Sequence, residues 1–154
     1  MPIVFDNAIN DIRAIAAGGN DRKEKARRLA ERIQRLGSYR WVGIYDVGAE
    51  LVSILGWVGP SAPEFPSFPV SKGLTSAAIA QKATVVVGDV RKDPRYLTAF
   101  GSTLSEMIVP VLSMDGRVIG TVNVESEKVD AFSARDQQMI EQCAEAAKLL
   151  WMLA

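Results

Sequence analysis

Hydrophobic and polar positions alternate along residues 119–126, as they do in a β-strand whose two faces differ. One face carries Gly120, Val122, Val124 and Ser126. The other carries Ile119, Thr121, Asn123 and Glu125. An amide and a carboxylate two residues apart are unusual on a face that packs into an apolar core. The alternation therefore predicts that this face forms the polar floor of a pocket.

Two further segments with strand character supply side chains to the same pocket. In 39–45 the alternation places Trp41 and Tyr45 on one face, and in 105–112 it places Glu106 on the face of Ile108. Two acids, an amide and two aromatic rings are thus expected to converge. The alternative is that both acids lie in water at strand ends, that Asn123 makes a local hydrogen bond, and that both rings belong to the core.

The remaining pattern predicts an α+β fold in a single domain, residues 1–154. Apolar positions at helical spacing predict helices at 7–17, 21–37 and 133–153 and a short helix at 74–82. Strands are predicted at 39–46, 50–57, 84–87, 105–112 and 117–124. Four prolines in 59–69 predict a long loop without regular structure that covers the pocket.

These elements suit an antiparallel sheet with the terminal helices packed on one face and the ligand pocket on the other. The N-terminal helices would occupy 1–37, the sheet and pocket loops 38–132, and the C-terminal helix 133–154.

The composition excludes several classes of function. Lysine and arginine balance aspartate and glutamate at 18 each, so no electrostatic argument favours nucleic acid or an anionic membrane as a partner. The chain has no histidine, which removes histidine-based catalysis and histidine ligation of metal or haem. We expect no cofactor, and one cysteine with no secretion signal or long apolar run predicts a cytoplasmic protein.

Four local patterns resemble those of GAF domains, and the resemblance covers nearly the whole chain. They are WVGIY at 41–45, VSKGLTSA at 70–77, SEMIVPV at 105–111 and VIGTVNVES at 118–126. The first and third are most similar to the free methionine-(R)-sulfoxide reductase branch of that family. The resemblance implies a GAF-like fold and a small-molecule site formed by Trp41, Tyr45, Thr75, Glu106, Thr121, Asn123 and Glu125.

The chain departs from the reductases where their sulfur chemistry takes place. The resemblance implies a cysteine at the position of Thr75 and a reacting cysteine near Ala99, but no cysteine occurs in 97–105. Asn123 also stands where the reductases have an acid. Sulfoxide reduction of this kind needs a thiolate, which threonine cannot supply. Cys143 lies on the apolar stripe of the last helix and is expected to be a buried packing residue.

These observations favour a non-catalytic sensor or signalling domain that binds a small amine-bearing metabolite, such as an amino acid derivative. Carboxylates pair with ammonium groups, and aromatic faces attract cations. Two alternatives stay open. One is an enzyme, a divergent free methionine-(R)-sulfoxide reductase, and the other is a dimerisation or interaction module with a vestigial pocket. The sequence names neither the ligand nor a downstream partner.

Surplus apolar residues in the terminal helices predict a homodimer. They lie on more than one side of their helices and include Ile9, Ile12, Ile15, Leu149, Trp151, Met152 and Leu153. A helix that only covers a sheet needs a single apolar stripe, so the surplus indicates an interface. The alternative is that residues 1–17 fold back over this surplus within one chain.

Overall fold

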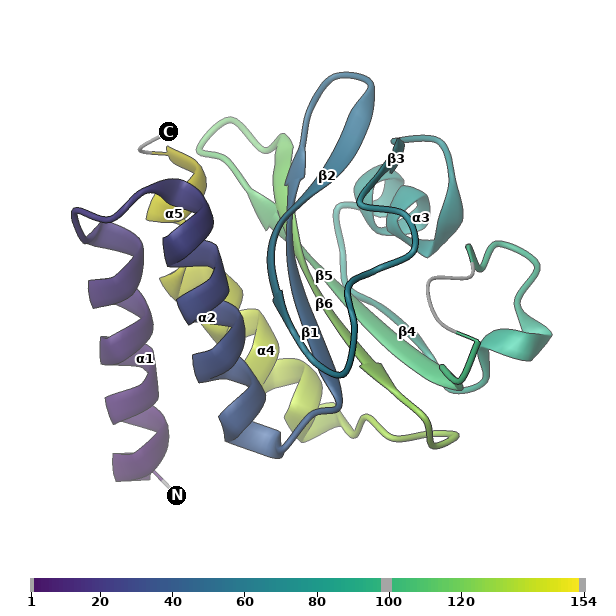
Figure 1. The fold of residues 1–154 in the computed structure, drawn as a ribbon, viewed down its shortest axis with the longest axis horizontal. Helices are drawn as coiled ribbons and strands as arrows, with labels where there is room; N and C mark the ends of the chain where they lie inside the picture. Colours follow the sequence, from purple (N-terminus) through teal and green to yellow (C-terminus); the bar gives the residue numbers. More distant parts are fainter. Residues whose placement is uncertain (1, 98–100, 153–154) are drawn as a thin grey trace.

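The computed structural model describes residues 2–97 and 101–152 (Figure 1). Its helices are α1 (Pro2–Ala17), α2 (Arg22–Gly37), α3 (Gly73–Gln81), α4 (Ala134–Ala146) and α5 (Leu149–Met152), with a 3-10 turn η1 at Val90–Lys92. Its strands are β1 (Trp41–Val47), β2 (Leu51–Val58), β3 (Ser67–Pro69), β4 (Val85–Val87), β5 (Ser105–Leu112) and β6 (Val118–Ser126).

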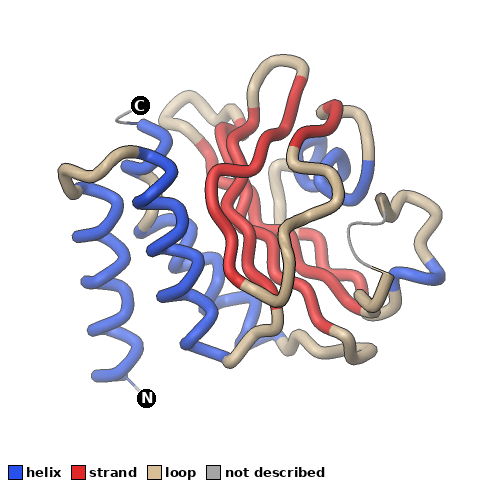
Figure 2. The backbone as a smooth tube through the Cα atoms, in the orientation of Figure 1, coloured by secondary structure: helices blue, strands red, loops and turns tan. Residues whose placement is uncertain are grey.

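The six strands form one antiparallel sheet in the order β3-β2-β1-β6-β5-β4. The terminal helices α1, α2, α4 and α5 lie on one side of it, whereas α3 and most loops lie on the other (Figures 1 and 2). This arrangement confirms the predicted α+β fold, in which terminal helices cover one face and leave the opposite face for a pocket.

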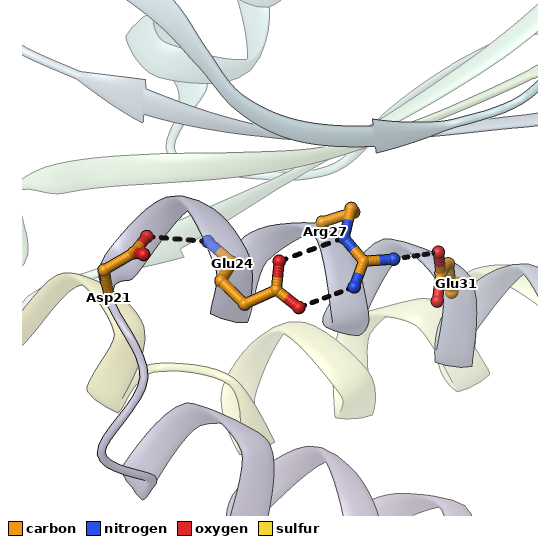
Figure 3. A network of polar contacts seen from close by, with 4 residues as sticks. All are labelled: Asp21, Glu24, Arg27 and Glu31. Carbon is orange, nitrogen blue, oxygen red and sulfur yellow. Dashed lines mark hydrogen bonds and ion pairs between the residues drawn. The ribbon is translucent and has the colours of Figure 1, made fainter.

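Helix α2 contacts the sheet through an apolar stripe that includes Leu29 and Ile33, both fully buried. The helix begins where the Asp21 carboxylate caps it by accepting the Glu24 backbone N–H at 2.9 Å. Its outer face carries charges, and Figure 3 shows the Arg27 guanidinium held between the carboxylates of Glu24 and Glu31. Pairs at this spacing add little to stability in water, so the buried stripe holds α2 in place.

The C-terminal helix predicted over 133–153 is two helices. Ser133 and Asp136 form a capping box at the start of α4, which ends at Ala146. After the break at 147–148, the short helix α5 directs the Trp151 indole into the sheet, where its N–H donates to the Tyr45 backbone carbonyl at 3.0 Å.

The sequence predicted no regular structure in the proline-rich segment 59–69, but part of this segment is a strand. Its last residues form β3, which pairs with Leu51–Ser53 of β2 at the edge of the sheet. Proline is tolerated there because an edge strand leaves one side of its backbone without ladder hydrogen bonds. Among the described residues, no helix has the length and apolar character needed to cross a membrane.

Candidate functional site

The predicted polar residues meet on the face of the sheet opposite the terminal helices. In the register of β1 with β6, Trp41 lies opposite Glu125 and Tyr45 opposite Thr121. In the register of β5 with β6, Glu106 lies opposite Glu125. Directly opposed residues share a face, with Cβ atoms about 5 Å apart. The three strands therefore bring these side chains together as the alternation predicts.

The two acids are not solvated strand ends. Glu106 is 7% exposed, Glu125 is 3% exposed and Asn123 is 4% exposed. Thr103 donates its hydroxyl to Glu125 at 2.8 Å, and Thr121 donates to Asn123 at 2.7 Å. The alternative that placed both acids in water is therefore wrong. The local hydrogen bond that the same alternative gave to Asn123 is present, with Thr121 as its donor.

A cavity of about 30 Å³ opens above these residues. Its walls come from β1, α3, the central strands and the loops on either side of α3. They are Tyr45, Phe65, Phe68, Gly73, Leu74, Thr75, Tyr96, Leu97, Glu106, Asn123 and Glu125. Such a volume holds about one water molecule, so a ligand the size of an amino acid requires the loop residues to move outward.

Of the other predicted site residues, Trp41 and Thr121 do not border this cavity, whereas Thr75 does. Trp41 borders a second cavity of about 50 Å³ on the far side of Glu125, and its indole N–H donates to the Ser61 carbonyl at 3.1 Å. Thr121 is fully buried beneath Asn123. Thr75, at the start of α3, is 4% exposed and borders the first cavity together with Tyr45.

Six of the residues that form the cavity walls were not among the predicted site residues. Phe65 and Phe68 come from the proline-rich segment, Gly73 and Leu74 begin α3, and Tyr96 and Leu97 follow η1. Aromatic residues within a stiff loop predicted to cover a pocket were a usable signal for the first pair. The polar turn before Tyr96 gave no comparable signal.

Burial raises the pKa of both acids. The pKa of Glu106 is well above its ordinary value because the group is desolvated and lies beside Glu125. Desolvation raises the pKa of Glu125 to about 7, against the opposing effect of the Thr103 hydroxyl. Burial and the two neighbouring carboxyl groups also raise the pKa of Tyr45.

The only thiol in the chain is remote from this cavity. Cys143 is fully buried in α4, in the core on the helical face of the sheet, as predicted. Burial raises the pKa of its thiol to about 12, so it carries almost no thiolate near neutral pH. Ala99 lies outside the described residues. Within the described residues, no group of acids and cysteine is arranged to hold a metal ion.

Comparison with known proteins identifies relatives of both the sequence and the fold. A family model described as GAF domain matches residues 19–150. The free methionine-R-sulfoxide reductase of Saccharomyces cerevisiae is 33% identical over 107 residues, which are 68% of this chain and 58% of the yeast protein. The chain thus spans less than two thirds of that relative.

Two solved structures resemble this one closely. The free methionine-R-sulfoxide reductase of Neisseria meningitidis, in complex with its substrate, has a TM-score of 0.84 and 26% identity, covering 96% of this chain and 88% of the other. The type II enzyme of Thermoplasma acidophilum has a TM-score of 0.75 and 33% identity, covering 84% and 95%.

Proposed function

Because the chain belongs to the GAF domain family, we propose that it is a non-catalytic sensor module that binds a small amine-bearing metabolite in the cavity between β1, β5, β6 and α3. Free amino acids and their derivatives are the preferred class. The proposal includes a cytoplasmic location, because a single free cysteine is consistent with a reducing compartment.

The observation that carries this proposal is the pair of buried acids, Glu106 and Glu125, which we call the carboxyl pair. Both border the cavity, and no lysine or arginine is among the described residues that line it. An ammonium group would supply the missing positive charge through charge-assisted hydrogen bonds. The similarity to two reductases of a free amino acid derivative supports the same ligand class.

Substitution of the carboxyl pair is expected to weaken binding of the ligand. A hydrogen bond to a charged group contributes about 1.5–3 kcal/mol, so Glu106→Gln and Glu125→Gln should each raise Kd about tenfold or more. A thermal-shift screen of amino acids, amines, nucleotides and organic acids identifies the ligand, and calorimetry measures both variants. Glu50→Gln, an exposed acid in the β1–β2 turn, is the control. Unchanged affinity in both pocket variants would refute the site.

We also expect no reduction of free methionine-(R)-sulfoxide, despite the similarity to the reductases. The cavity wall has Thr75 rather than a thiol, and Cys143 is on the other side of the sheet. The assay follows thiol-driven consumption of the sulfoxide by the purified protein, with Cys143→Ser beside it. Multiple turnovers that this substitution abolishes would establish the enzyme alternative and make Cys143 catalytic.

A homodimer through the terminal helices remains part of the proposal, with a smaller interface than the sequence indicated. Ile12 and Trp151 are buried within the chain by the packing of α1 and α5, which corrects their assignment to the surplus, and Leu153 lies outside the described residues. Leu149 and Met152 stay 39% and 43% exposed beside α1.

Light scattering of the full-length protein at micromolar concentration tests the dimer. We expect twice the monomer mass, and we expect a double substitution of Leu149 and Met152 by glutamate to restore the monomer. Deleting residues 1–17 should also weaken the dimer, but it uncovers the core beneath Ile12, so the double substitution is the cleaner variant. A monomer that persists at high concentration rules the interface out.

A further inference from the structure

The carboxyl pair is isolated from compensating charge. Glu106 and Glu125 are directly opposite each other in the β5–β6 register, and both border the cavity. Thr103 donates a hydrogen bond to Glu125, but the Glu106 carboxyl makes none with any described residue. Two buried carboxylates at this spacing repel each other strongly, and a proton held between them is the simplest way to remove that repulsion.

The described groups that surround the carboxyl pair in the first cavity carry no positive charge that could replace this proton. From β1, the Tyr45 phenol faces both acids and stays neutral, because burial and the acids raise its pKa. From β4, the residue opposite Glu106 is Val87. Toward α3 and the following loop, the cavity is lined by Leu74, Thr75, Tyr96 and Leu97, which carry no positive charge.

Arg40 is a described cation that borders the second cavity but not the first. Its guanidinium pairs with Glu127 at 2.9 Å. This second cavity, about 50 Å³, also has the hydroxyls of Ser102, Thr103 and Ser126 in its walls. It is large enough to hold water beside Glu125.

We propose that the empty site holds one proton on the carboxyl pair, and that the ligand's ammonium group takes the place of this proton when it binds. The inference rests on the proposed function and adds a coupling to it. One carboxylic acid, one carboxylate and one ammonium group become two carboxylates and one ammonium group, and one proton passes to bulk water. Net charge balances on both sides of this exchange.

Proton displacement sets the pH dependence of binding. Below the pH at which the pair loses its proton unaided, affinity for a cationic ligand should rise about tenfold for each pH unit, because one proton is released per ligand bound. Above that pH, affinity should be constant until the amine itself begins to lose its charge. The domain would then respond to the ligand and to pH through the same two side chains.

Methylammonium chloride is the test probe, since it carries the proposed binding group and little else. Protein labelled with ¹³C at the glutamate carboxyl carbons is titrated with acid and base, with and without methylammonium, against sodium chloride at equal ionic strength. Carboxyl shifts report ionisation directly. Resonances are assigned with Glu106→Gln and Glu125→Gln, and Glu50→Gln serves as the surface control.

The expected result is that one carboxyl of the pair remains protonated near pH 6 in sodium chloride and becomes ionised in methylammonium, with affinity rising about tenfold per pH unit. In either pocket variant this displacement should disappear. The inference is overturned if both acids are ionised near pH 6 without methylammonium, if methylammonium leaves their ionisation unchanged, or if its affinity does not depend on pH.

These results separate the inference from the proposed function. An amine-bearing metabolite that binds the cavity with a pH-independent Kd would retain the function and remove the proton exchange. Conversely, methylammonium that displaces the proton, in a protein that binds no amine-bearing metabolite in the screen, would retain the exchange and remove the function.

Discussion

Replacing Glu125 with glutamine is expected to stabilise the ligand-free protein at pH 8 by on the order of 3 kcal/mol. Glutamine preserves the shape of the side chain and can still accept the Thr103 hydroxyl, but it carries no charge to desolvate. The folded protein raises the pKa of Glu125 from 4.5 to about 7. The pair therefore keeps a proton that the unfolded chain has already released.

The pH dependence has a definite sign. Between about pH 4.5 and 7 the folded state binds more protons at this position than the unfolded state, so the free energy of unfolding falls as pH rises through that window. Below the window both proteins are neutral at position 125 and should be almost equally stable. Above the window the wild type has lost all of the stability that the Glu125 proton contributed, whereas the variant, which has no titrating group at position 125, has lost none.

Urea unfolding of both proteins at several pH values between 4 and 8 measures this difference. Comparing the two cancels the effect of acids elsewhere, such as Asp136, whose pKa is lowered and whose contribution falls at more acidic pH. Glu127→Gln, an exposed acid just beyond β6, is the matched control and should show no comparable gain. A wild type as stable as Glu125→Gln at pH 8 would mean that the pair is not desolvated.

Replacing Trp151 with alanine is expected to destabilise the protein by about 3–5 kcal/mol, the usual cost of removing a large buried ring. The indole is 7% exposed and lies against Gly120, where an added Cβ would be only 2.1 Å from the ring nitrogen. Its removal leaves a cavity between α5 and the sheet and an unpaired hydrogen-bond acceptor at the Tyr45 carbonyl.

Met114→Ala in the β5–β6 turn provides the control, because Met114 is 86% exposed and its substitution should change stability by no more than about 0.5 kcal/mol. Trp151→Phe retains most of the ring but loses the hydrogen bond, and should fall between the two. The free energy of unfolding is obtained from urea denaturation with circular dichroism. A loss below about 1 kcal/mol in Trp151→Ala would show that α5 does not hold the sheet.

The sheet and the floor of the site could be predicted because both follow from short-range periodicity. The alternation in 119–126 fixes which side chains of β6 share a face, and the hairpin turn near Asp115 fixes that strand against β5. Glu106 shares the face of Asn123 and Glu125 because the β5–β6 register shifts by one residue between Val111 and Leu112, an irregularity that the alternation alone does not predict.

The walls of the cavity could not be predicted in this way, because they depend on contacts between distant segments. Tyr96 reaches the cavity through a loop whose path is set by tertiary packing rather than by any local pattern. Trp41 lies on the predicted face of the sheet, but its indole N–H donates to the Ser61 carbonyl and the residue borders the second cavity instead of the first. Strand parity determines the side of the sheet on which a ring lies, but not the cavity that it borders.

Tyr45 contributes to both sides of the sheet at once. Its ring borders the cavity, while its backbone carbonyl accepts the Trp151 indole N–H beside an irregularity in the β1–β2 register. Tyr45 thus lines the cavity on one face of the sheet and is hydrogen-bonded to α5 on the other. A ligand that moved the backbone at Tyr45 would therefore also move the acceptor of the Trp151 hydrogen bond, which is one of the contacts that hold α5 against the sheet.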